Sequence, residues 1–426
     1  MRLTILHTND IHGRVDGLAR IATLVERIRA ETPHTVLFLD AGDVEETTNR
    51  LSNITKGAAM HRLLGAAGCD AATVGNAAWL RYGPEVIGEH ARVASYPLLL
   101  ANLKPVEGVH DSFLLGDVGI VGVTASFEGY FGDSISFAIE ALPEIPLVRD
   151  LARDLRARGA ELVVVLSHLG YDLEGYRAAV DDKQLARELA REIDLVISAH
   201  THHLLPDGDR IGDVVLASAG EYAQHLGRIE IDGDRIDVSV MPVPDDTPPH
   251  PAVVAEAERI EPEIAAFLDE TLGEVDRPLD ADWIAEMLRE RMSAEVGLAV
   301  AGQILSGPPL PPGRIVRGAL WDVCDTSANP GVATISGERL RRMLDIARSP
   351  AWVEERRRPL RGRAHGGLHV AGIDPAQVDP GREYVVAATD YELEAYGGLV
   401  DGDWKLSVRY EFPTIVREAI EEHLRR

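Results

Sequence analysis

The chain has 426 residues, 45% of them hydrophobic, so it is long and apolar enough to bury more than one core, and we expect two domains. Its formal net charge of -26 offers no basic surface for nucleic acid phosphates, so we expect no nucleic acid polymer as a partner. The two cysteines, Cys69 and Cys324, are far apart in the sequence and predict packing residues, not a disulfide framework or a thiolate metal site.

The N-terminus, MRLTILHTND, reaches a polar motif within ten residues and has no basic start, apolar stretch and cleavage site. No apolar run approaches the roughly 20 residues that span a bilayer. We therefore expect a cytoplasmic protein that does not enter a membrane. The sequence leaves its oligomeric state open.

Residues 1 to about 240 alternate short β-rich runs with amphipathic helical patterns, which are clearest at 18–30 and 143–158. This alternation predicts a layered α/β domain with buried strands. The predicted strands are 3–8, 35–42, 71–75, 96–103, 119–125, 161–168, 194–200 and 214–220.

Residues 242–251 contain five prolines and predict a domain junction, because proline interrupts both helices and central strands. A linker helix interrupted near Pro262 is expected next. Beyond it, helices at 283–292 and 337–346 mix with strands at 331–336, 383–389 and 405–410, which is typical of a smaller α+β domain. We thus predict a catalytic domain at 1–245, a linker at 246–275 and a second domain at 276–426. The charged stretch 354–363 is expected to be a solvated loop.

Five of the predicted strands are followed by side chains of the kinds that bind metals. Strand ends in α/β folds form the crevice where ligands bind, so these residues should converge in space. Taken singly, such residues are more often helix caps or turn formers, but their occurrence on one strand and helix pattern favours a shared site. They are Asp10, His12, Asp43, Asn76, His168, His200 and His202.

This donor set has carboxylates, imidazoles and one carboxamide but no thiolate, which suits manganese, iron, zinc or nickel. Two such ions about 3.5 to 4 Å apart clamp a phosphoryl group and activate a bridging water for in-line attack. One carboxylate must bridge them, and we predict Asp43, because Gly42 lets the chain bend toward the ions. The set therefore predicts phosphate ester hydrolysis, with Asp43, Asn76 and His168 as catalytic residues.

In these motifs the chain resembles the 5'-nucleotidase family of calcineurin-like metallophosphoesterases. HTNDIHG, DAGD, GN, SHLG and AHTHH look like that family's five metal-binding motifs in order. The resemblance implies a calcineurin-like sandwich followed by a smaller substrate-binding domain. It also implies two ligand sets, the first being Asp10, His12, Asp43 and His202, and the second being Asp43, Asn76, His168 and His200.

The chain departs from the family at the third motif, which normally reads GNH followed by an acidic residue that orients the histidine. Ala77 and Leu80 stand at those two positions. The loss of an acid or electrostatic stabiliser there is expected to slow ester cleavage by roughly 10² to 10⁴-fold without abolishing metal-assisted attack. Arg81, His203 or His225 are alternatives that could substitute, and the sequence does not select among them.

The second domain resembles the family's substrate-binding domain only in outline. The expected arginine is missing around Gly302, and the turn ending at Asn329 lacks its aromatic residue. By resemblance, Tyr391, Tyr396 and Asn329 would bind the substrate, although an aromatic before paired glycines is equally a packed turn. The expected substrate is a nucleotide or another small phosphorylated compound.

Two alternatives stay open. One is a metal- and nucleotide-binding protein whose turnover is weak or lost because Ala77 and Leu80 replace the usual dyad. The other is related metallohydrolase chemistry on a bond other than a phosphate ester, since one fold can serve several reactions.

Overall fold

The computed structural model describes residues 1–104, 106–125, 140–173, 180–324, 326, 328–351, 366–396 and 406–426, and the side chains of 394–396 are outside the description. The chain forms two compact units, Met1–Ile264 and Ala265–Arg426, divided within the predicted linker 246–275. The predicted solvated loop at 354–363 lies outside the described residues.

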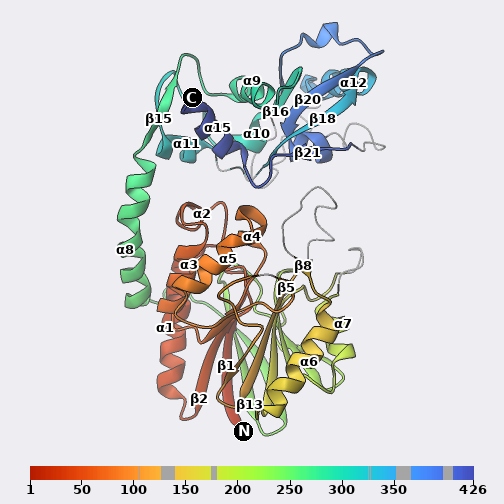
Figure 1. Ribbon diagram of the computed structural model, residues 1–426. Coiled ribbons are helices and arrows are strands. Elements are labelled where there is room, and N and C mark those ends of the chain that lie inside the picture. Colours follow the sequence, from red (N-terminus) through yellow and green to blue (C-terminus); the bar gives the residue numbers. More distant parts are fainter. Residues whose placement is uncertain are drawn as a thin grey trace. The chain divides into compact units, whose positions relative to one another are not determined.

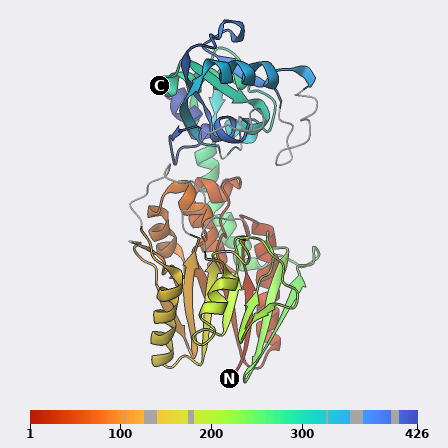
Figure 2. The same cartoon turned by 90° about the vertical axis from the view of Figure 1, so that its right-hand side faces the viewer.

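The first unit contains two six-stranded sheets. Figures 1 and 2 together show their strands running in the same general direction, with α1 and α6 on opposite outer sides. The first sheet has the order β14 (Arg235–Pro242), β13 (His225–Asp232), β1 (Arg2–Thr8), β2 (Thr35–Asp40), β3 (Ala71–Thr73) and β4 (Leu98–Leu99). The second has the order β11 (Asp209–Ile211), β12 (Val214–Ala217), β10 (Leu195–Ser198), β9 (Leu162–His168), β7 (Val118–Thr124) and β6 (Ser112–Leu115).

Side-chain alternation along the strands explains the layers. In β1, Leu3 and Ile5 join Val164 and Leu166 of β9 in a core between the sheets, whereas Leu6 joins the core on the helical side. The first sheet is covered by α1 (Val15–Glu31), α3 (Ala58–Ala66), α4 (Ala77–Tyr82) and α5 (Glu85–Val93), and the second by α6 (Glu144–Ala157) and α7 (Asp182–Glu188). The short helix α2 (Arg50–Ile54) precedes α3. The predicted layered α/β sandwich is confirmed.

The predicted strand 96–103 is wrong as a single element. It is reduced to β4 and to β5 (Leu103–Lys104), which pairs with β8 (Glu140–Ala141). Between them the Asn102 side chain exchanges hydrogen bonds with the main chain of Thr124, donating to its carbonyl at 2.7 Å and accepting from its N–H at 3.0 Å. A side chain thus takes the place of strand pairing where the chain bends.

The linker helix α8 (Pro251–Leu268) continues through Pro262, so the predicted interruption is wrong. Proline removes one helical hydrogen bond, but Glu258 and Pro262 are both exposed, so water can satisfy the freed carbonyl. No described helix is both long and apolar enough to cross a bilayer.

The second unit has a mixed sheet in the order β19 (Leu368–Ala371), β16 (Val296–Val300), β20 (Glu383–Thr389), β18 (Pro330–Ser336) and β21 (Arg409–Tyr410). One face packs on α9 (Ala281–Arg291) and α15 (Val416–Leu424), and the other on α12 (Gly337–Ala347). The other described elements of this unit are an antiparallel pair of strands and four helical segments. They are β15 (Thr271–Val275) and β17 (Gly313–Val316), α10 (Ala301–Ile304), α11 (Arg317–Val323), the 3-10 turn η3 (Pro375–Gln377) and the π-helical segment η4 (Tyr391–Tyr396). The predicted α+β character is confirmed.

Candidate metal centre

Six of the seven predicted ligands lie on loops that follow inner strands of the two sheets, and His168 is the last residue of β9. β1 and β2 are parallel, and so are β9 and β10, so each pair delivers its loops to the same edge. Main-chain hydrogen bonds join the loops, because the N–H of Asp10 donates to Gly42 and that of His12 donates to Asp43, both at 2.9 Å. The N–H of His200 donates to the Asp10 carboxylate at 3.0 Å. The structure therefore brings residues from the two sheets together.

One group of ligand atoms gathers around Asp10. The Nε2 atoms of His12 and His202 lie 3.1 Å apart, and they are 3.7 and 3.5 Å from Asp10 Oδ1. Three donor atoms this close fit around a single cation.

A second group gathers around His168. Its Nε2 atom lies 3.2 Å from Asp43 Oδ2 and 3.2 Å from Asn76 Oδ1, and the His200 ring centroid is 5.2 Å from that of His168. Asp43 Oδ2 is also 4.0 Å from His12 Nε2. Asp43 therefore faces both groups, as a bridging carboxylate must.

The loops that carry the ligands are strained. Nine described residues other than glycine have positive φ, and five of them are Asp10, His12, Asp43, His200 and His202. Side chains rarely adopt this backbone region, and strained residues cluster at functional sites where the surroundings hold them in place. The surrounding fold therefore holds these five residues in unfavourable backbone conformations, and those conformations orient their side chains.

Two glycines allow the loops to touch. Gly42 has φ +95, and a Cβ there would lie 2.7 Å from the N atom of Gly75 and 2.9 Å from Nδ1 of His168. A Cβ on Gly75 would lie 2.0 Å from Asp43 Oδ1. Both contacts are closer than real Cβ atoms approach, so only glycine fits at either position.

Three histidines of the centre are oriented through Nδ1. His168 Nδ1 is 2.9 Å from the carbonyl of Ala41, and His12 Nδ1 is 3.2 Å from that of Glu45. His202 Nδ1 pairs with the carboxylate of Glu221. Oxygen acceptors at Nδ1 direct the Nε2 lone pair toward the cluster, which is the usual arrangement around a metal. Sequence reasoning missed Glu221, although it follows the predicted strand 214–220 just as the predicted ligands follow theirs.

Charges in the cluster shift the pKa values of its members. Burial alone would raise the pKa of Asp43, but the charge and hydrogen bond of His168 hold it well below its usual range. Burial lowers the pKa of His168, yet the opposing charges of Asp43 and Asp10 raise it to about 10. Burial lowers the pKa of His200 to about 4. A proton on His168 thus balances the carboxylates, and a bound cation would have to displace it.

The buried carboxyl group of Asp182 connects β9, which ends at His168, with β10, which precedes His200. Asp182, at the start of α7, accepts hydrogen bonds from the hydroxyls of Ser167 and Ser198, which lie at the ends of β9 and β10. Burial raises the pKa of Asp182 to about 7, against the lowering effect of both hydroxyls. This contact fixes the spacing between the strand ends that carry His168 and His200.

The missing dyad leaves a methyl group beside the centre. The N–H of Ala77 donates to Asp43 Oδ1 at 2.8 Å, and Leu80 packs partly against the helical core. Of the suggested substitutes, Arg81 is buried with its guanidinium 4.7 Å from the Tyr82 ring centroid, and the ring centroid of exposed His203 is 4.9 Å from that of Tyr171. His225 begins β13.

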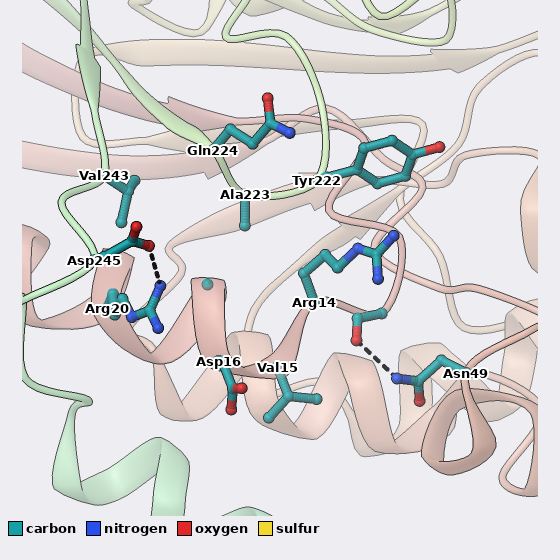
Figure 3. Close-up of a pocket in the computed structure, with 12 residues that line it drawn as sticks. Arg14, Val15, Asp16, Arg20, Asn49, Tyr222, Ala223, Gln224, Val243 and Asp245 are labelled. Carbon is teal, nitrogen blue, oxygen red and sulfur yellow. Dashed lines mark hydrogen bonds and ion pairs between the residues drawn. The ribbon is translucent and has the colours of Figure 1, made fainter. Parts of the chain in front are cut away.

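A hollow of about 590 Å³ adjoins the centre (Figure 3). Tyr222 connects the two, since its ring centroid lies 5.5 Å from that of His12 and 5.9 Å from that of His202. The guanidinium of Arg14 is 4.8 Å from the Tyr222 ring centroid. Asn49 and Gln224 add amide groups to the lining. The hollow thus offers an aromatic face, neutral polar groups and the guanidinium of Arg14, and its lining also contains Asp16 and the ion pair of Arg20 with Asp245.

The predicted substrate-binding residues belong to the second unit. Asn329 donates its side-chain N–H to the Thr414 carbonyl at 2.8 Å, and Tyr391 packs partly against that unit's core. The side chain of Tyr396 lies outside the described residues. Gly302 lies within α10, AGQI, which carries no arginine.

Comparison with known proteins connects this geometry to a family. Residues 3–204 match the family model described as calcineurin-like phosphoesterase. The uncharacterized metallophosphoesterase YunD of Bacillus subtilis (strain 168) is 25% identical over 424 residues, covering 91% of this chain and 88% of that protein. The 5'-nucleotidase of Bos taurus is 28% identical over 252 residues, covering 52% of this chain and 41% of that protein. The match therefore spans less than half of the bovine protein's length.

The fold comparison extends over the whole chain. The crystal structure of a 5'-nucleotidase precursor from Thermus thermophilus superposes with a TM-score of 0.62 and 19% identity, covering 100% of this chain and 96% of that one. The second unit is therefore part of a fold that the two proteins share, and the calcineurin-like architecture expected from the sequence is confirmed.

Proposed function

Since the chain carries a domain of the calcineurin-like phosphoesterase family, we propose that it hydrolyses a phosphate ester with the help of two divalent metal ions. The observation that carries the proposal is Asp43 Oδ2, which lies 3.2 Å from His168 Nε2 and 4.0 Å from His12 Nε2. One carboxylate oxygen facing both groups of nitrogen ligands is the geometry that a pair of ions requires.

The residues divide into two ligand sets that share Asp43. Asp10, His12, Asp43 and His202 would hold one ion, and Asp43, Asn76, His168 and His200 the other, chosen from manganese, zinc, iron and nickel. Bound ions supply Lewis acidity toward the phosphoryl oxygens and lower the pKa of coordinated water. The chain itself orients the ligands. The Nδ1 contacts fix the rings of His168 and His12, and the hydrogen bonds of Asp182 hold the ends of β9 and β10 together.

The substrate that we propose is a nucleotide or another small phosphorylated compound. A relative described as a 5'-nucleotidase supports this class, and the net charge of -26 disfavours a polyanionic nucleic acid. Tyr391, Tyr396 and Asn329 of the second unit remain our proposed contacts to the base. The hollow beside His12 and His202 is a place for further polar parts of the substrate, because Arg14 and Tyr222 lie in its lining.

The test is phosphate release by the purified protein with manganese and a panel of nucleoside monophosphates, cyclic nucleotides and sugar phosphates. We expect metal-dependent release from at least one compound and its loss after chelation. An Asp43→Asn variant should be inactive, and a Glu230→Gln variant, changed on the exposed side of β13, should retain wild-type activity. An absence of metal-dependent release across the panel would contradict the proposal.

A second candidate function is metal and nucleotide binding with weak or lost turnover. The observation that favours it is Ala77, whose N–H binds Asp43 but whose side chain ends in a methyl group where the family has an imidazole. Calorimetry would detect binding of a nucleotide without hydrolysis. If Ala77→His, alone or with Leu80→Asp, then produces hydrolysis, the wild type is a binding protein. If Ala77→His, alone or with Leu80→Asp, does not raise the hydrolysis rate above that of the wild type, this candidate is excluded.

A further inference from the structure

A second cluster of metal-binding side chains lies in the first unit, apart from the seven ligands. Glu45 lies on the loop after β2, His61 on α3 and His90 on α5, and their side chains are buried, with exposed fractions of 4%, 2% and 1%. One donor atom from each lies within 4.8 Å of the others. Burying three ionisable side chains together costs free energy unless their polar atoms are bound to one another or to an ion.

The hydrogen bonds of His90 determine which of its nitrogens carries a proton. Nε2 lies 2.7 Å from the carbonyl of Lys56, which can only accept, so Nε2 must carry hydrogen. Nδ1 lies 3.3 Å from Glu45 Oε1. In a neutral imidazole this arrangement points the Nδ1 lone pair at a carboxylate oxygen, which is repulsive. A proton shared by His90 Nδ1 and Glu45 Oε1, or a cation, must therefore lie between them.

Burial opposes a second proton on His90. The His90 side chain is only 1% exposed, so a charged imidazolium there would lose the solvation that water gives it. The ring centroids of His61 and His90 are only 4.4 Å apart. Two imidazoliums could not coexist at this distance in a buried site, and the cluster has a single carboxylate.

The surroundings of His61 match those of a metal ligand. Nδ1 lies 2.7 Å from the hydroxyl of Tyr96, and Nε2 lies 2.7 Å from Glu45 Oε1. When Nδ1 donates its hydrogen to the hydroxyl, Nε2 is free to bind an ion on the side of Glu45. In the predicted metal centre too, an oxygen acceptor at one ring nitrogen directs the other nitrogen inward. The loop packs tightly on this cluster, because a Cβ on Gly57 would lie 2.7 Å from Glu45 Cγ and 2.8 Å from His90 Nε2.

We propose that Glu45, His61 and His90 bind a third divalent cation, distinct from the predicted pair. Two imidazoles and one carboxylate suit zinc, iron or manganese. Bonds of about 2.0 to 2.2 Å place neighbouring ligand atoms about 3 to 3.5 Å apart. The 3.3 Å separation of His90 Nδ1 and Glu45 Oε1 already fits, and the 2.7 Å contact with His61 opens when the ion replaces the shared proton.

This third ion would have a structural role. Glu45 is two residues after Asp43, and its main-chain carbonyl lies 3.2 Å from His12 Nδ1. An ion on the Glu45 side chain would therefore hold the loop that presents Asp43 and would fix the acceptor that orients His12. The two sites share no ligand, so each can be emptied by its own substitution.

The experiment counts and locates ions in the full-length protein. After saturation with zinc and removal of free metal, we expect three ions per chain in the wild type by mass spectrometry, and two in His90→Gln. Glutamine keeps a donor for the Lys56 carbonyl but removes the Nδ1 ligand. The matched control is His110→Ala, an exposed histidine of the same unit that belongs to neither cluster, which should keep three ions.

A zinc-edge anomalous map of wild-type crystals provides the second readout, which does not depend on the folding of a variant. A peak between Glu45, His61 and His90 supports the proposal, whether or not ions are also found at the predicted pair. A wild-type map without this peak, or a His90→Gln variant that retains the full wild-type ion count, would overturn it. Peaks at the predicted pair alone would leave the proposed function intact and remove this inference.

Discussion

Nδ1 of His168 lies 2.9 Å from the main-chain carbonyl of Ala41, and this contact joins the end of β9 in one sheet to the loop after β2 in the other. Because a carbonyl only accepts, His168 presents Nε2 to Asp43 and Asn76. The predicted metal centre is thus built across the two sheets, and its ligands are oriented before any ion binds.

Replacing His168 is expected to remove one ion of the predicted pair. His168→Ala should retain one ion less than the wild type and should lose activity by about 10²-fold or more, since each ion supplies several kcal/mol of transition-state stabilisation. Metal analysis and phosphate release measure the two effects. His110→Ala, which changes an exposed histidine outside the predicted centre, serves as the control and should change neither. Unchanged metal content in His168→Ala would show that this residue is not a ligand.

Removing the charge of Glu221 tests the orientation of His202. Glu221→Gln should weaken metal binding by about 10- to 100-fold, as substitutions behind a histidine ligand usually do. Titration with manganese in a competing chelator gives the affinity. Glu230→Gln removes an exposed carboxylate that pairs with Arg228, and its affinity should equal that of the wild type. Equal affinities in all three proteins would mean that Glu221 does not support a metal ligand.

The close approach of Gly75 to Asp43 predicts a selective loss of metal binding. A Cβ at position 75 would meet Asp43 Oδ1 at 2.0 Å, so Gly75→Ala must displace the Asp43 carboxylate, which we propose as the bridge between the ions. The control is Gly88→Ala in α5, where a Cβ meets its nearest atom at 3.4 Å, an ordinary contact. Gly88→Ala should bind metal as the wild type does, and Gly75→Ala should bind it at least tenfold more weakly. Tight metal binding by Gly75→Ala would contradict the geometry of this loop.

Buried His7 predicts a pH dependence of stability. Burial lowers its pKa from 6.5 to about 3, and neither ring nitrogen has a hydrogen-bond partner among the described residues. The unfolded chain therefore binds a proton between these values that the folded chain does not, so His7 destabilises the fold as the pH falls below 6.5. The contribution is about 1.4 kcal/mol per pH unit.

The His7→Leu variant isolates this effect. Asp40 and Asp182, whose pKa values burial raises to about 7, act in the opposite direction, because their contribution to stability is lost as the pH rises from 3.8 toward 7. The comparison of His7→Leu with the wild type cancels both. Urea unfolding between pH 7 and pH 5 should show the variant gaining stability relative to the wild type. A difference that stays constant with pH would refute the assignment.

The candidate ligands could be selected from the sequence because strand ends are visible as apolar runs followed by polar residues. Asp43 and His168 are examples, since each follows a buried strand with little ambiguity. Contacts between distant segments could not be predicted in this way. The turn at Asn102 depends on Thr124, and the role of Glu221 depends on the position of His202 in space. A local pattern contains neither relationship.

The same reason explains the cluster at Glu45, which sequence reasoning also missed. His61 and His90 are each the only histidine of their helices, and their meeting with Glu45 depends on the packing of α3 against α5. Neither helix contains two closely spaced histidines, which is the sequence pattern that indicates a metal site on a helix.

The central claim is that two ions bind around Asp43, and the most direct measurement is an anomalous difference map from crystals saturated with manganese in the presence of inorganic phosphate. We predict two peaks about 3.5 to 4 Å apart. One should be coordinated by Asp10, His12 and His202, the other by Asn76, His168 and His200, and both by Asp43. A map with one peak or none among these residues would contradict the account.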